Sequence, residues 1–194
     1  KRQGWSSTIN FSDSIQEKFL RFFEDEQKFT LGVCNGCQML SSIKEIIPGT
    51  DSWPSFQKNH SDQFEARLSQ VKILKSKSVL LSNMEDWSLP IIVSHGEGRA
   101  CFKNEDEINK LFDSEKICMT FVDSSGYQTE QYPLNPNKSP SGITGITNDN
   151  GNITIMMPHP ERVFRSHQFS WKPLSWGEYS PWMQIFINAK RFVS

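Results

Sequence analysis

The amino-acid sequence predicts an α/β fold in which helices flank a β-sheet. Residues 13–25 carry apolar side chains at helical spacing, and residues 152–157 form a mostly apolar run that is typical of a buried strand. Residues 29–33 alternate in the manner of a strand and end in a glycine-rich turn, which leads into a second helical pattern. This order of strand, tight turn and helix favours an α/β architecture.

Capping and breaking residues predict where the helices begin and end. Ser14 to Glu17 matches a capping box for the first helix, residues 13–25. The second helix is expected to stop at Pro48-Gly49. The last helix is expected to use Ser180 as its cap, with Pro181 at the first helical position. Its inward-facing side chains are predicted to be Trp182, Ile185, Phe186, Ala189 and Phe192.

The middle of the chain is predicted to be rich in strands. Strands are expected at 64–74, 90–94, 116–122, 142–147 and 152–157. The polar or proline-rich segments 104–107 and 132–141 are predicted to be loops within one domain. A chain of 194 residues with 36% hydrophobic content can fill a single core, so we expect one domain over residues 1–194.

Composition argues against several classes of partner. The formal net charge is −1, from 21 basic and 22 acidic side chains, so no summed field would attract nucleic acid or an anionic membrane. The opening residues are too polar for a secretory signal, and no apolar run has membrane length. We therefore expect a cytoplasmic protein with no nucleic-acid or membrane partner. Its cysteines are expected to be reduced; they are Cys34, Cys37, Cys101 and Cys118.

The strongest local motif is Gly-Val-Cys-Asn-Gly at 32–36, a cysteine version of the turn that exposes a nucleophile between a strand and a helix. Such a turn strains the backbone of Cys34, and we expect Gly32 and Gly36 to be required because larger side chains would collide with the neighbouring strand and helix. The helix N-terminus favours a thiolate, and the amide of Asn35 can donate to an oxyanion.

Other interpretations of Cys34 remain open. A cysteine at the end of a buried strand is often an inert packing residue. Cys34 and Cys37 also have the Cys-x-x-Cys spacing of a thioredoxin-like redox site, although that interpretation leaves Gly32 unexplained. A zinc site is not favoured, because Cys101 and Cys118 are single and no second pair completes four ligands.

A second motif, Met-Pro-His-Pro-Glu-Arg at 157–162, directly follows a predicted strand. Pro160 favours an extended conformation for His159, and side chains two apart in an extended segment point the same way. His159 and Glu161 are therefore predicted to lie side by side, as a base and its orienting carboxylate, with Cys34 as the nucleophile. The alternative is a loop histidine, with Glu161 paired to a neighbouring arginine.

A third segment, Ser-His-Gly-Glu-Gly-Arg at 94–99, packs two glycines and three charge-capable groups into six residues. It is typical of a binding loop, and His95 is a candidate substrate contact. A solvated tight turn is an equally good interpretation, and His95 as the catalytic base is a less favoured one.

These three motifs together resemble the phosphoribosylformylglycinamidine synthase family, specifically the C-terminal class I glutamine amidotransferase domain of its large single-chain form. Shorter matching stretches extend the resemblance over essentially the whole chain, at 53–54, 59–67, 135–137, 142–145 and 180–183. The resemblance implies a class I glutaminase fold of flavodoxin-like character. Within the loop 135–141, Lys138 and Ser141 depart from the glycine and asparagine expected there.

The resemblance also implies an activity. Glutamine would be hydrolysed through a γ-glutamyl thioester on Cys34, with His159 shuttling protons. Asn35, Gly36, Gln38 and His95 would contribute to glutamine binding, and Cys37 would be a packing residue. Ammonia would pass to a synthetase domain of the same polypeptide, where formylglycinamide ribonucleotide and ATP react. No cofactor is expected in this chain; ATP and Mg would belong to the synthetase part.

The beginning of the chain suggests a fragment. It starts at Lys1, without an obvious first strand, and the family's glycine-rich oxyanion loop would precede Gly4. We therefore expect a fold truncated at its N-terminus, cut from a longer synthase. A non-catalytic docking fragment is the alternative to an active glutaminase.

Overall fold

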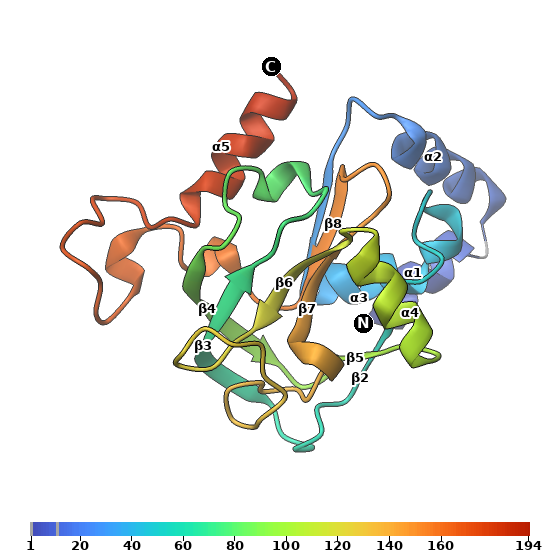
Figure 1. The fold of residues 1–194 in the computed structure, drawn as a ribbon. Coiled ribbons are helices and arrows are strands. Elements are labelled where there is room, and N and C mark those ends of the chain that lie inside the picture. The colour runs from blue at the N-terminus through green and yellow to red at the C-terminus, as the bar shows by residue number, and fades with distance from the viewer. Residues whose placement is uncertain (1, 11) are drawn as a thin grey trace.

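The computed structural model describes residues 2–10 and 12–194 and contains helices on both faces of a sheet (Figure 1). The α-helices are α1 Arg2–Asn10, α2 Asp13–Glu24, α3 Asn35–Ser42, α4 Glu105–Asp113 and α5 Met183–Phe192. The strands are β1 Thr30–Val33, β2 Ser55–Gln57, β3 Glu65–Ile73, β4 Ser88–His95, β5 Arg99–Cys101, β6 Ile117–Phe121, β7 Ile143–Thr147 and β8 Ile153–Met156. Short 3₁₀ turns are η1 Lys44–Ile46, η2 Val79–Leu81, η3 Pro140–Gly142, η4 Pro160–Arg162 and η5 Ser166–Gln168.

The main sheet has six strands in the order β1-β8-β7-β6-β3-β4. β1 and β8 run parallel, and the other neighbouring strands of this sheet are antiparallel. β2 and β5 form a separate antiparallel pair. The predicted α/β fold is confirmed, as a curled mixed sheet consistent with a class I glutaminase. The predicted strands correspond to β1, β3, β4, β6, β7 and β8 within a few residues.

The sheet separates two apolar cores. Successive side chains of a strand point to opposite faces, so Ile155 and Met156 of β8 enter different cores. Ile155 belongs to the core that contains Leu40 of α3 and Leu111 of α4, whereas Met156 belongs to the core that contains Ile185 of α5. Figure 1 shows α3 and α5 on opposite sides of the sheet. Full burial of each such side chain contributes about 1.5–3 kcal/mol to folding.

Two helices were not predicted, and one of them replaces an expected loop. The segment 104–107 begins α4: Asn104 is its cap, and the Asn104 Oδ1 accepts a hydrogen bond from the Glu107 amide at 3.0 Å. Three acidic residues in the first turn, which favour a helix N-terminus, gave this segment the polarity of a loop. Helix α1 occupies the polar opening of the chain, where no apolar periodicity indicates a helix.

Two predicted caps are wrong. Helix α2 starts at Asp13, so its N-cap is Ser12 rather than a residue of the expected capping box, and Ser12 makes no side-chain cap bond. Helix α5 starts at Met183 with Trp182 as its N-cap, although in the turn before it the Ser180 hydroxyl accepts from the Trp182 amide at 3.2 Å and donates to the Val163 carbonyl. In α5 the buried face includes Ile185, as predicted, but Phe186 is 38% exposed.

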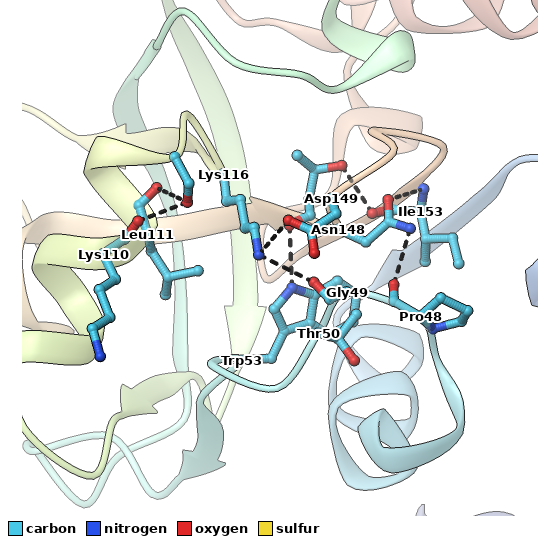
Figure 2. A network of polar contacts seen from close by, with 12 residues as sticks. Pro48, Gly49, Thr50, Trp53, Lys110, Leu111, Lys116, Asn148, Asp149 and Ile153 are labelled. Carbon is cyan, nitrogen blue, oxygen red and sulfur yellow. Dashed lines mark hydrogen bonds and ion pairs between the residues drawn. The ribbon is translucent and has the colours of Figure 1, made fainter.

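A polar network closes the end of the sheet where the hairpin between β7 and β8 turns (Figure 2). The Lys116 ammonium lies 2.7 Å from the Asp149 carboxylate and donates to the Gly49 carbonyl at 3.3 Å. The indole of buried Trp53 donates to the Thr147 carbonyl at 3.2 Å. These contacts fasten the segment that follows α3 to the hairpin. Across the described ranges 2–10 and 12–194, no helix is long and apolar enough to cross a membrane.

Candidate active site

Cys34 occupies a strained turn between β1 and α3. Its backbone has φ 51° and ψ −107°, a conformation that non-glycine residues rarely adopt. Its amide donates to the Met156 carbonyl at 2.9 Å, and its carbonyl accepts from the Gln38 amide at 3.0 Å. The turn is therefore fixed on both sides, by the neighbouring strand β8 and by the first turn of α3.

Gly32 is required for this close packing, as predicted. A Cβ at Gly32 would lie 2.6 Å from the Leu40 Cδ1 and 3.0 Å from the Gly36 carbonyl oxygen. The expected collision at Gly36 is wrong. A Cβ there would meet no described heavy atom within 4 Å outside the local helix backbone, because Gly36 lies in the first turn of α3 on a side that nothing packs against.

His159 and Glu161 lie side by side after β8. The His159 Nδ1 is 2.6 Å from the Glu161 Oε1, and the His159 amide donates to the Ile92 carbonyl of β4 at 2.8 Å. His159 itself has the non-helical backbone that Pro160 favours, but the residues after it form the 3₁₀ turn η4 instead of continuing as an extended segment. The two side chains thus meet across the start of a tight turn.

The imidazole of His159 is held in its charged form. Burial lowers its pKa, but interactions with the Cys34 thiol and with the Glu161 carboxylate outweigh burial and raise it to about 9. Burial likewise raises the pKa of Glu161, and its hydrogen bond to His159 more than reverses that effect and lowers it. At neutral pH the two side chains form an imidazolium–carboxylate pair.

The second nitrogen of His159 is placed for contact with Cys34. Nε2 is buried and makes no hydrogen bond of good geometry within the described part of the chain, because the Cys34 Sγ points to the Ser94 carbonyl oxygen, 3.7 Å away. The thiol is nevertheless close enough to the imidazole to raise its pKa.

A cavity of about 490 Å³ contains most of the predicted site residues. Those in its wall are Cys34, Asn35, Gln38, His95 and His159. The buried Gln38 side chain donates to the Glu97 carbonyl, which fixes it against the loop 94–99. Glu161 supports the cavity from behind His159, and Gly36 does not belong to the lining.

The lining also includes six residues that were not named as site residues: Val33, Phe64, Ser94, Gly96, Glu97 and Arg162. Phe64 and Ser94 are two examples. Both lie at strand ends, Phe64 just before β3 and Ser94 near the end of β4, and Ser94 contributes its backbone carbonyl to Cys34. Their positions at the ends of predicted strands were the only feature of the sequence that could have indicated a place in the cavity wall. A somewhat larger cavity, of about 550 Å³, lies between Arg67 and Asp123, and its described lining includes neither cysteine nor histidine.

His95 differs from His159 in its surroundings. Burial, together with the nearby charge of His159, lowers the pKa of His95 to about 4. The His95 Nδ1 faces the Asn59 amide oxygen at 3.2 Å rather than a carboxylate. The Glu65 carboxylate raises the pKa of His95, but burial outweighs this effect, and the resulting neutral ring favours His159 as the base.

The remaining cysteines are separated from this chemistry. Cys37 is fully buried, and burial raises the pKa of its thiol well above the ordinary value. All four cysteines are free thiols. Among residues 2–10 and 12–194, no group of three histidine, cysteine or acidic side chains is arranged to hold a metal ion.

The sequence also matches the family model of the CobB/CobQ-like glutamine amidotransferase domain over residues 2–193. The chain belongs to this family. The likeness to a glutamine amidotransferase domain that the motifs indicate is thereby confirmed. In such a domain, a thiol, an imidazolium and buried amide groups around one cavity can bind a carboxamide and attack its carbonyl carbon.

Two solved structures resemble this amidotransferase domain. The structure of PurLQS from Thermotoga maritima matches with a TM-score of 0.65 and 20% identity, over 96% of this chain and 68% of that chain. The structure of a putative GMP synthase subunit from Thermoplasma acidophilum matches with a TM-score of 0.49 and 12% identity, over 95% of this chain and 67% of that chain. The first likeness supports the fold.

Proposed function

We propose that this domain hydrolyses glutamine to glutamate and ammonia through a γ-glutamyl thioester on Cys34. The observation that carries the proposal is the position of Cys34 on a strained turn, in one cavity with His159, whose Nδ1 is 2.6 Å from Glu161. A free thiol is only a few per cent ionised at neutral pH, so a thiolate nucleophile needs a neighbouring positive charge. The His159 imidazolium supplies that charge.

One group, the His159 imidazole, transfers the protons in both halves of the reaction. The Cys34 sulfur attacks the γ-carbonyl carbon, and the His159 Nε2 proton moves to the amide nitrogen as the C–N bond breaks and ammonia leaves. His159, now neutral, removes a proton from a water molecule that attacks the thioester. Glutamate departs, and the thiolate and imidazolium are restored. Glu161 keeps the proton on Nδ1, so that Nε2 is the nitrogen that exchanges protons.

The negative oxygen of each tetrahedral intermediate needs a hydrogen-bond donor. The Asn35 amide is the first of α3, and the first amides of a helix have no acceptor within the helix. We assign it to the oxyanion. The Cys34 amide does not serve this role, because it donates to the Met156 carbonyl. Removing one oxyanion donor lowers the rate of such enzymes by about 10²–10³.

We further propose that the ammonia serves a synthetase. The motifs resemble the C-terminal amidotransferase domain of the large single-chain phosphoribosylformylglycinamidine synthase, and this resemblance supports a synthetase domain of the same polypeptide as the partner. The fold also resembles PurLQS from Thermotoga maritima. That domain would use ATP and Mg to convert formylglycinamide ribonucleotide to formylglycinamidine ribonucleotide in cytoplasmic purine biosynthesis. Residues 1–194 would be its glutaminase domain and would carry no cofactor.

The geometry disfavours a redox function for Cys34 and Cys37. A Cys-x-x-Cys redox site requires both thiols to exchange with a partner, but Cys37 is 0% exposed and its thiol is stabilised in the protonated form. A purely docking role would leave the arrangement of Cys34, His159 and Glu161 without a purpose.

Substitution of the thiols tests the proposal. In the full synthase, Cys34→Ala is expected to abolish ammonia release from glutamine and to leave synthesis from added ammonium intact. Cys101→Ala is the matched control, because Cys101 lies outside the cavity, and it should retain both activities. Loss of both activities in Cys34→Ala, or full glutaminase activity, would refute the assignment. A redox site would make Cys37→Ser as damaging as Cys34→Ser.

A further inference from the structure

The loop 95–98 is held by the side chain of one buried residue, Asn59, which is 1% exposed. The Asn59 Nδ2 donates to the carbonyls of Gln63, at 3.0 Å, and His95, at 2.8 Å. Its Oδ1 accepts from the Gly98 amide at 3.0 Å and lies 3.2 Å from the His95 Nδ1. The side-chain amide therefore has all its donors and acceptors engaged.

These contacts fix which way the Asn59 amide points. A flipped amide would set its oxygen against the two carbonyl oxygens of Gln63 and His95, and its NH₂ group against the Gly98 N–H. The oxygen consequently faces His95. Since an amide oxygen only accepts hydrogen bonds, the His95 Nδ1 must carry the proton in this pair. A neutral His95 ring then has an unprotonated Nε2.

That nitrogen is a buried acceptor beside the substrate cavity. His95 lines the cavity with Cys34, and within the described chain its Nε2 has no hydrogen-bond partner. A buried polar atom without a partner is unfavourable unless something else satisfies it. Glutamine carries two groups with N–H donors, its α-ammonium and its γ-carboxamide, and either can satisfy an unprotonated imidazole nitrogen.

We propose that Asn59 is a positioning residue of this site, which holds His95 as the Nδ1–H tautomer and presents its Nε2 as a hydrogen-bond acceptor to an N–H group of the substrate. This inference rests on the proposed glutamine hydrolysis. Asn59 acts through His95 and is not itself part of the cavity lining. The segment that contains Asn59 thus acquires a role that its sequence alone did not indicate.

Gly98 completes the arrangement. A Cβ at Gly98 would lie 2.2 Å from the His95 Cε1, so only glycine leaves room for the ring. Asn137, which is fully buried, donates to the Gly98 carbonyl at 2.8 Å. Asn59 and Asn137 therefore hold the two sides of one glycine. Asn59 also faces the His95 ring through its Oδ1, whereas Asn137 makes no hydrogen bond to that ring in the described chain. Asn137 is the matched control.

The tautomer can be measured directly by ¹⁵N–¹H correlation NMR of the histidine rings, with His95 assigned from a His95→Gln variant. The wild-type His95 is expected to carry its proton on Nδ1. Asn59→Ala should release the tautomer, so that the Nε2–H form of His95 becomes populated, whereas Asn137→Ala should retain the proton on Nδ1. A wild-type ring protonated on Nε2, or an unchanged tautomer in folded Asn59→Ala, overturns the inference. If Asn59→Ala does not fold, the wild-type measurement still decides, because a His95 ring protonated on Nε2 overturns the inference.

Kinetics of the full synthase test the link to the substrate. Asn59→Ala should raise KM for glutamine by about 5- to 10-fold, the effect of one lost hydrogen bond, and change kcat less. Asn137→Ala should leave KM closer to the wild type. An equal rise in both variants, or a fall in kcat alone, contradicts the proposal. Glutamate γ-methyl ester distinguishes the two donors: a KM effect that persists assigns the α-ammonium, and one that disappears assigns the carboxamide.

The two proposals can fail separately. Glutaminase activity in Cys34→Ala would refute the proposed reaction but would not affect the conclusion about the tautomer of His95. A wrong tautomer with a normal Cys34→Ala result would remove only the role of Asn59.

Discussion

The His159 Nδ1 lies 2.6 Å from the Glu161 Oε1, and this contact determines which nitrogen of His159 is available to Cys34. His159 is buried and Glu161 is 46% exposed, so the pair has one side in the protein and one side in solvent. The charged forms stabilise each other, so that Glu161, together with the Cys34 thiol, raises the pKa of His159 to about 9, and His159 lowers that of Glu161. The geometry therefore predicts measurable effects on both catalysis and stability.

Glu161→Gln is expected to lower kcat of glutamine hydrolysis and to shift its pH profile. Without the carboxylate, the pKa of His159 falls from about 9, so the alkaline limb of the kcat/KM profile should move to lower pH. General acid–base catalysis contributes about 10²–10⁴-fold, and we expect part of that factor to be lost. An unchanged alkaline limb would contradict the assignment of His159 as the proton carrier.

Glu161→Gln should also change how the free energy of unfolding depends on pH. The folded-state pKa of His159 is raised above its ordinary 6.5, so its stabilisation is complete below pH 6.5 and is lost as the pH rises through about 9. The stabilisation by Glu161, whose pKa is lowered from 4.5, is present above pH 4.5 and is lost as the pH falls through its folded-state pKa. The free energies of unfolding of the wild type and Glu161→Gln should therefore differ most between pH 4.5 and 6.5. Because Glu161 is partly exposed, the difference should be no more than ~1 kcal/mol. The two free energies should become equal above pH 9.

Asn104→Ala is expected to destabilise the fold by about 1 kcal/mol, because it removes the oxygen that caps α4. Ser12→Ala is the matched control, since Ser12 precedes α2 but makes no side-chain cap bond. Urea unfolding of both variants measures the difference. Equal destabilisation by the two substitutions would mean that the Asn104 cap contributes nothing beyond helix propensity.

The sequence predicted the local parts of the site better than their assembly. The turn at Cys34 follows from glycine rules that act over a few residues, and Pro160 favours the non-helical backbone of His159. Glu161 meets His159 as predicted, but through the turn η4 rather than along an extended segment. Their proximity depends on parallel pairing of β1 with β8, with Val33 opposite Met156, which joins segments more than a hundred residues apart. No local pattern specifies that register.

Elements whose polarity resembles that of a loop were harder to predict. The acidic first turn of α4 concealed the helical spacing of Ile108 and Leu111, both of which pack in the core beneath it.

The cavity wall also depends on residues that act through their backbone. Ser94 offers its carbonyl to Cys34, and the identity of a side chain does not report such a contact.

The two glycines that flank Cys34 should respond differently to alanine. Gly32→Ala places a Cβ 2.6 Å from the Leu40 Cδ1 and 3.0 Å from the Gly36 oxygen, so the buried Leu40 side chain must shift and the first turn of α3 must give slightly. Overpacking of this kind destabilises by about 1–3 kcal/mol, and it should also lower kcat because the Cys34 turn moves.

Gly36→Ala meets no described atom within 4 Å beyond the local helix backbone, and Gly36 lies inside α3. Alanine is preferred to glycine in a helix interior by about 0.5–1 kcal/mol, and this is an upper limit for Gly36 in the first turn of α3, so the variant should be at least as stable as the wild type. Thermal unfolding together with a glutaminase assay compares the pair. If Gly36→Ala destabilises the protein as much as Gly32→Ala does, both glycines are sterically required. If only Gly32→Ala destabilises it, as we expect, the steric requirement for glycine lies on the strand side of the turn alone.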